Sequence, residues 1–120
     1  MAPPGAPARI LCAMGEASYT FFADLAAEAT VPPRGIHSQT LFEADGVELV
    51  MFALAAGERL SEHTAARPAI VHVISGEGRL TVAGDDHALL PGSWLHMATR
   101  TPHTLVAQTD LVFALYLLPG

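Results

Sequence analysis

Short apolar runs separated by turn residues make up most of the chain after residue 35. Runs of this kind, rich in Val, Leu, Ile and Phe, are typical of β-strands and are too short for most helices of globular proteins. Gly, Asp, Pro and Ser stand between them, as in the Ala-Asp-Gly turn at 44–46. The expected strands are 36–44, 47–54, 69–75, 79–83, 87–90, 93–98, 103–108 and 111–118, preceded by a further one at 9–14, while 55–68 and 84–86 are expected to be connections. So many short strands at close spacing predict an all-β sandwich or barrel.

The N-terminal part has a different pattern. Residues 18–29 are rich in alanine and place Phe21, Phe22 and Leu25 at helical spacing, with Ser18 positioned to cap the first turn. The Pro-Pro pair that follows cannot continue a helix. We therefore expect a short amphipathic helix ahead of the strands.

The length of the chain, 120 residues, is enough for a single domain with its own core. We expect a disordered lead-in at 1–8, an N-terminal strand and helix at 9–35, and the barrel at 36–120. Apolar residues make up 51% of the chain, and runs such as 111–118 are apolar on both faces. Strands carry apolar residues on both faces when both sides of their sheet are covered. Here we expect one side to be covered by the barrel interior and the other by the N-terminal segment or a partner subunit. This predicts a homodimer, with residues 36–54 and the last strand at the contact.

Charge and composition exclude several classes of partner. The formal net charge is −6, and the six basic residues are all arginine, without a basic cluster. This argues against nucleic acid or an anionic membrane as partner. No apolar run is long enough to cross a membrane, and the first residues do not resemble a secretory signal, so we expect a cytoplasmic protein. Cys12 is the only cysteine, which excludes an internal disulfide and a thiolate metal site.

Two motifs carry the candidate chemistry. The first is a glycine, five residues and a histidine, followed by a strand that ends in glycine; the second is a Pro-Gly turn, a strand and a Pro-His pair. Their residues are Gly57, His63 and Gly76 in the first, and Pro91, Gly92, Pro102 and His103 in the second. Over about residues 36–118 the chain thereby resembles the cupin superfamily. The resemblance implies an all-β, cupin-type double-stranded β-helix (a jelly-roll barrel), here with a short N-terminal helix.

The first motif departs from the family pattern at two ligand positions. The family has a second histidine two residues after the first, where this chain has Ala65. The family's glutamate falls at or near Ala69 or Ile70, and neither side chain binds a metal. The usual set of three histidines and one glutamate is thus reduced to His63 and His103, which the resemblance implies line one pocket.

Two more histidines lie on strands of the same stretch. With His96 and His72 facing inward, four imidazoles would surround one divalent transition metal such as Zn, Ni, Fe, Mn or Cu. Strand alternation turns His72 away from the face of Ala69, whereas it leaves His96 undecided. Without such a site, no cofactor is implied.

Three polar side chains are candidates for the mouth of the pocket. Glu62 precedes His63. Its carboxylate is a candidate general base, and the alternative is a solvent-exposed charge that pairs with an arginine. Arg67 and Arg100 lie in the two loops at the motif end of the barrel, where an anionic ligand would use either of them. The two other histidines, His37 and His87, are interpreted as surface or strand-edge residues.

Three classes of function remain open. The resemblance implies a metal-dependent oxygenase or isomerase with the metal as Lewis acid. The alternative is a non-catalytic module that binds or senses a small molecule without metal. A third is a structural or regulatory dimer. Whether the protein is an enzyme does not follow from the residues.

Overall fold

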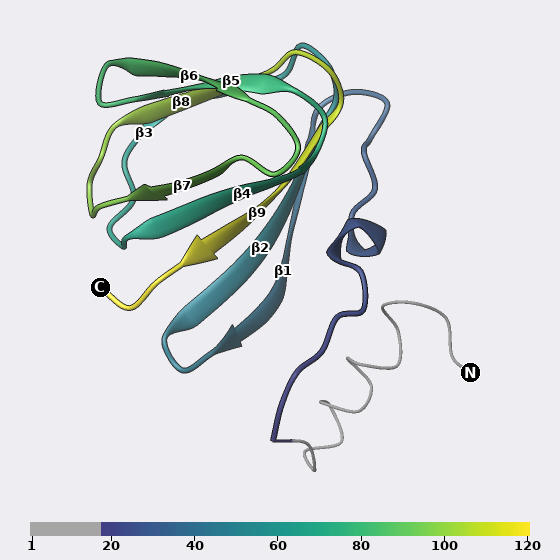
Figure 1. Ribbon diagram of the computed structural model, residues 1–120, viewed down its shortest axis with the longest axis vertical. Coiled ribbons are helices and arrows are strands. Elements are labelled where there is room, and N and C mark those ends of the chain that lie inside the picture. The colour runs from purple at the N-terminus through teal and green to yellow at the C-terminus, as the bar shows by residue number, and fades with distance from the viewer. Residues whose placement is uncertain (1–17) are drawn as a thin grey trace.

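The computed structural model describes residues 18–120, with the backbone alone for His63, and contains two antiparallel sheets that face each other (Figure 1). The five-stranded sheet has the order β1-β2-β9-β4-β7, and the four-stranded sheet has the order β3-β8-β5-β6. The strands are β1 (Ile36–Ala44), β2 (Val47–Leu54), β3 (Arg59–His63), β4 (Ala69–Ser75), β5 (Gly78–Val82), β6 (Asp85–Leu89), β7 (Trp94–Met97), β8 (His103–Ala107) and β9 (Leu111–Leu117). The predicted all-β jelly-roll barrel is therefore confirmed. No helix of the described part is long and apolar enough to cross a membrane.

The observed strands differ from the predicted ones in two places. β3 lies within the stretch expected to be a connection, because its sequence Arg-Leu-Ser-Glu-His offers only one apolar residue to the pattern. β6 begins two residues earlier than expected. Ala83 (φ 50°) and Gly84 (φ 87°) form a two-residue turn with both φ angles positive, which closes the ladder directly from Val82 to Asp85.

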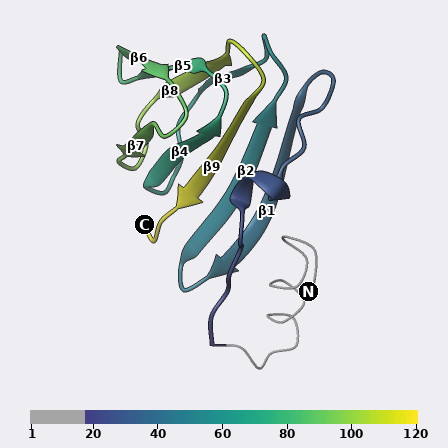
Figure 2. The same ribbon diagram turned by 45° about the vertical axis from the view of Figure 1, so that its right-hand side comes forward.

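The expected N-terminal helix is reduced to a single 3₁₀ turn, η1 (Leu25–Glu28). Asp24, rather than Ser18, caps it by accepting a hydrogen bond of 3.0 Å from the amide of Ala26. Isolated helices of about twelve residues are marginal in water, so tertiary packing decides the conformation. The segment instead runs across the outer face of the five-stranded sheet (Figure 2). The strand expected at 9–14 lies outside the described residues.

The centre of the five-stranded sheet, β2 and β9, is covered on both faces, and alternate residues supply the two cores. On β9, Phe113 faces the barrel interior, whereas Ala114 belongs to the cluster on the outer face. The apolar residues of the N-terminal segment that pack against this outer cluster are Phe22, Leu25, Ala29 and Val31. This explains why the last strand is apolar at successive positions.

Gly76 shows how tightly the turns pack against the strands. It has a φ of 87°, and a Cβ built on it would lie 1.9 Å from the carbonyl oxygen of Asp110. No side chain fits at that distance, so the glycine that ends the first motif is required by the β4–β5 turn.

One end of the barrel, called the mouth here, is formed by two loops that cross between the sheets, by two hairpin turns and by the C-terminal tail. Loop 64–68 joins β3 to β4, and loop 98–102 joins β7 to β8. The β1–β2 turn at 45–46, the β5–β6 turn at 83–84 and the tail at 118–120 complete the mouth, because the ladders align these ends with the two loops.

Replacing Leu25 by alanine should lower the free energy of unfolding by about 1–2 kcal/mol, because a half-buried leucine loses part of its packing on the sheet. Phe21→Ala is the matched control: Phe21 lies in the same segment but is 60% exposed, so the change should stay within about 0.5 kcal/mol. Urea denaturation measures both values. Equal losses would contradict a specific contact between Leu25 and the outer face.

Candidate binding cavity

A cavity of about 120 Å³ lies between the two sheets. Its lining consists of Phe52, Leu60, Val71, Leu80, Met97, His103, Leu105, Phe113 and Leu115. His103 is the only polar residue in this set. The rings of Phe52 and Phe113, which face each other across the β2–β9 ladder, stack with centroids 4.9 Å apart and planes at 5°. As far as its lining is described, the interior is therefore an apolar chamber with the imidazole of His103 as its polar group.

His103 is held in a defined orientation at the start of β8. Its Nδ1 lies 2.9 Å from the carbonyl oxygen of Thr101. A carbonyl only accepts hydrogen bonds, so Nδ1 carries the proton and Nε2 has the lone pair. The half-buried ring is thereby held in one orientation, and the same contact of Nδ1 with a backbone carbonyl is common for imidazoles that bind metals.

His63 is described by its backbone only. It ends β3, and its Cα lies opposite that of His103 in the β3–β8 ladder. An irregularity between Leu60 and His63 shifts the register by one residue. The expectation that the His63 side chain lines the pocket falls outside the described part of the structure.

The other ligand positions of the first motif carry no metal donor. Ala69 faces the interior at 2% exposure, paired with Met97 and Leu117 in the ladders. Ala65 lies in a loop of the mouth, where its carbonyl accepts a hydrogen bond of 2.7 Å from the Arg100 amide. Among residues 18–120, the described side chains contain no group of three His, Cys, Asp or Glu that could hold a metal ion.

His72 and His96 are not brought to the cavity. Val71 and Val73, on either side of His72, belong to the interior core, so His72 lies on the outer face of β4. Leu95 and Met97 pack on the interior in the same way, which leaves His96 on the outer face of β7. The structure therefore does not assemble the four imidazoles considered above around one point.

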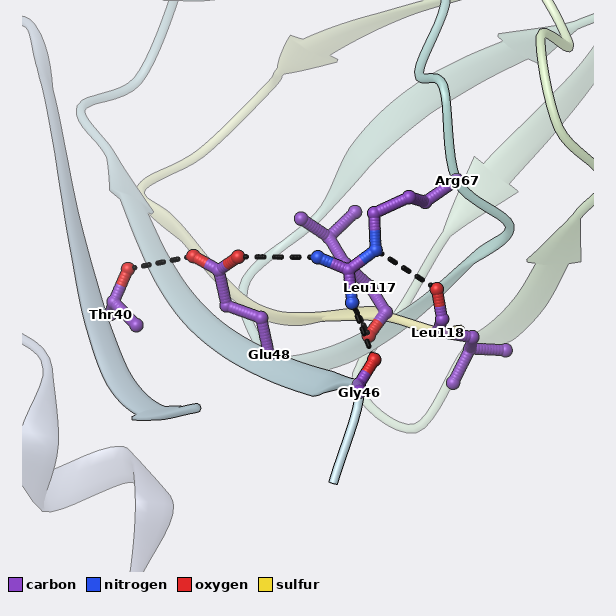
Figure 3. A network of polar contacts seen from close by, with 6 residues as sticks. All are labelled: Thr40, Gly46, Glu48, Arg67, Leu117 and Leu118. Carbon is purple, nitrogen blue, oxygen red and sulfur yellow. Dashed lines mark hydrogen bonds and ion pairs between the residues drawn. The ribbon is translucent and has the colours of Figure 1, made fainter. Parts of the chain in front are cut away.

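Arg67 is engaged in contacts within the protein (Figure 3). Its Nη2 donates to the carbonyls of Gly46 (2.5 Å) and Leu117 (3.2 Å), and its Nε donates to that of Leu118 (3.0 Å). Its Nη1 lies 3.5 Å from a carboxylate oxygen of Glu48. Three carbonyls and a carboxylate thus surround the guanidinium, which ties loop 64–68 to the tail and to the β1–β2 turn. We call this set of contacts the Arg67 clamp.

The remaining candidates for the mouth have exposed side chains. Glu62 lies exposed on β3, and Arg67 forms its ion pair with Glu48 rather than with Glu62. Arg100 has a φ of 60° and contributes its amide to the contact with Ala65. Neither Glu62 nor Arg100 belongs to the cavity lining described above.

Sequence reasoning considered an apolar barrel with two imidazoles as one alternative, but it did not identify the aromatic pair in the lining. The signal was available in part, because Phe52 and Phe113 lie on apolar strands at the centre of the predicted barrel. What it could not give was their pairing in register, which depends on β2 and β9 being neighbours in the sheet although 56 residues, 55–110, lie between the two strands in the chain.

Comparison with known proteins identifies the sequence region and the fold. A sequence family described as Cupin domain matches residues 50–118. A conserved protein of unknown function from Streptococcus pyogenes is similar in structure, with a TM-score of 0.74, 22% identity, and coverage of 88% of this chain and 90% of that one. A cupin superfamily protein from Desulfitobacterium hafniense has a TM-score of 0.75 and 21% identity, over 80% and 88% of the two chains. A putative mannose-6-phosphate isomerase from Ralstonia eutropha has a TM-score of 0.72 and 19% identity, over 83% and 99%. The comparison with curated proteins found no match.

Arg67→Gln should lower the free energy of unfolding by about 1–3 kcal/mol, because three carbonyls lose charged donors and two of these hydrogen bonds are partly buried. Arg100→Gln is the matched control in the other loop of the mouth, and its side chain is exposed, so the effect should stay within about 0.5 kcal/mol. Thermal or urea denaturation measures the difference. A stability unaffected by Arg67→Gln would sink the structural role of the clamp.

Proposed function

The chain belongs to the Cupin domain family, and on this premise we propose that it binds a small, neutral, mainly apolar molecule inside the barrel without catalysing a reaction. The ligand would be about the size of one aromatic ring and would carry a single hydroxyl group. The observation that carries this proposal is the composition of the cavity lining, in which His103 is the one polar side chain among eight apolar ones in the part of the lining that the structure describes.

The size of the cavity supports a ligand of this class. Its volume is about 120 Å³, and apolar cavities of about 150 Å³ in other proteins stay dry and bind benzene. Burial of such a ring is favourable in proportion to the apolar area removed from water. The His103 imidazole would accept a hydrogen bond from the hydroxyl group, and this would orient the ligand toward the mouth.

The lining argues against a sugar phosphate, despite the similarity to a putative mannose-6-phosphate isomerase. A polyol would have to bury several hydroxyl groups with one imidazole as partner, and each unsatisfied polar group costs about 1–3 kcal/mol. A phosphate would need cationic donors, but the Arg67 guanidinium is occupied by the clamp. The similarity in fold does not carry the substrate with it.

The donors present do not fit the metal site that the family commonly has. Transition metals in proteins usually take three or four protein ligands. The family's second histidine is Ala65 here, and its glutamate falls at or near Ala69 or Ile70, so at most two imidazoles, His63 and His103, come from the motifs. We therefore favour the binding or sensing module over a metal-dependent oxygenase or isomerase.

Phenol should bind more tightly than benzene, since its hydroxyl donates to His103. In His103→Leu the ratio of the two affinities should fall by about three- to tenfold, the value of one hydrogen bond, while benzene binding persists. NMR titration of the amide signals measures both dissociation constants. Glucose is the polar control and should not bind. Absence of any response to phenol and benzene in the unaltered protein would refute the proposed function.

Protein purified without an affinity tag should contain well below one equivalent of Zn, Ni, Fe, Mn or Cu, because the donor set is incomplete. Mass spectrometry with an inductively coupled plasma measures the content. One equivalent that disappears in both His63→Ala and His103→Ala would contradict the metal-free module and favour the metal-dependent enzyme.

A further inference from the structure

We propose that ligands reach the cavity from the side, between the free edges of β6 and β7, and that His87 sets the width of this entrance. The inference rests on the proposed binding function, because it concerns the access route to the same cavity. It assigns a role to a histidine that neither motif contains.

The two sheets leave a seam on one side of the barrel. β6 is the last strand of the four-stranded sheet and β7 the last strand of the five-stranded sheet, and no ladder joins them in the described part of the chain. A groove of about 360 Å³ lies along this seam. We call it the side groove, and its lining is Val71, His87, Ala88, Leu89, Ser93, Trp94 and Leu95.

The side groove and the cavity are adjacent, since Val71 lines both. On the five-stranded sheet, Val71 lies directly opposite Leu95 of β7, which lines the groove. On the four-stranded sheet, Leu80 lines the cavity and lies directly opposite His87 of β6. Opposite residues in an antiparallel ladder share a face. One step toward the seam on either sheet therefore leads from the cavity to the groove.

The mouth is more firmly closed than the seam. Besides the Arg67 clamp, three backbone hydrogen bonds connect the loops of the mouth. They run from the Arg100 amide to the Ala65 carbonyl (2.7 Å), from the Ala83 amide to the Pro102 carbonyl (2.9 Å) and from the Leu118 amide to the Pro68 carbonyl (2.9 Å). Opening the mouth would break several of these backbone bonds at once. Opening the seam breaks no ladder and requires only that apolar side chains such as Val71 and Leu95 change rotamer, which is faster than a loop rearrangement.

His87 is suited to control the seam because it is exposed and contributes nothing to the interior core. Its neighbour Leu89, at 3% exposure, belongs to the core instead, so a substitution there would disturb the fold. At position 87 the side chain can be enlarged or truncated while the fold is kept.

The test measures association and dissociation rates of fluorobenzene by ¹⁹F exchange NMR in full-length protein. His87→Trp should slow both rates by about tenfold and His87→Ala should raise both, with the dissociation constant unchanged within about twofold, because a route affects the barrier and not the bound state. Arg100→Trp, which places the same indole side chain at the mouth, is the matched control and should leave both rates unchanged.

The outcomes separate the two proposals. No binding of fluorobenzene to the unaltered protein would overturn the binding function and the side entrance together. Binding with rates that neither His87 variant alters, or rates that fall only in Arg100→Trp, would overturn the side entrance alone. A changed dissociation constant in His87→Ala would mean that His87 contacts the bound ligand, and this too would overturn its role as an entrance. Circular dichroism verifies that each variant is folded.

Discussion

The centre of the five-stranded sheet is apolar on both faces, and the rest of the structure depends on covering both of them. Alternate residues of β2, β4 and β9 supply the barrel interior on one side and the cluster around Met51 and Ala114 on the other. The four-stranded sheet covers the first face, and residues 22–31 cover part of the second. Much of the chain's apolar excess is thus satisfied within one subunit. The high apolar content of the chain therefore gives less support to a homodimer, which stays a prediction.

The sequence predicted what local pattern and motif spacing determine. The strand runs, the two motifs and the barrel follow from alternation and turn residues, and the family match over residues 50–118 confirms the cupin resemblance. β3 was not predicted because its polar residues face solvent at the edge of the barrel. The prediction of an N-terminal helix was wrong because contact of this segment with the sheet outweighs a weak helical propensity. Propensity and pattern are local, whereas these two outcomes depend on partners distant in the chain.

The candidate site was harder to predict than the fold, and Arg67 illustrates why. Its place in a loop of the mouth suggested a contact with an anionic ligand, since a guanidinium in a loop is normally available to solvent. In the folded chain it reaches the carbonyls of Gly46, Leu117 and Leu118, three residues from two other segments. No spacing in the sequence encodes that convergence, which arises only when β9 lies between β2 and β4. A guanidinium that already donates hydrogen bonds to backbone carbonyls is a structural element. Its charge is then not available to an anionic ligand.

The same register explains why an incomplete motif and an apolar chamber occur together. Ala69 pairs with Met97 and Leu117 at 2% exposure, so a carboxylate there would be buried among hydrocarbon and would need a bound cation to offset its desolvation. With alanine, no cation is required, and Met97, Leu115 and the stacked rings of Phe52 and Phe113 can close around the space. The imidazole of His103 is oriented by the Thr101 carbonyl and gives the apolar chamber a polar group in a defined direction. Metal chemistry and apolar binding are therefore alternative uses of one barrel, and the residues at a few inward positions determine which of them it supports.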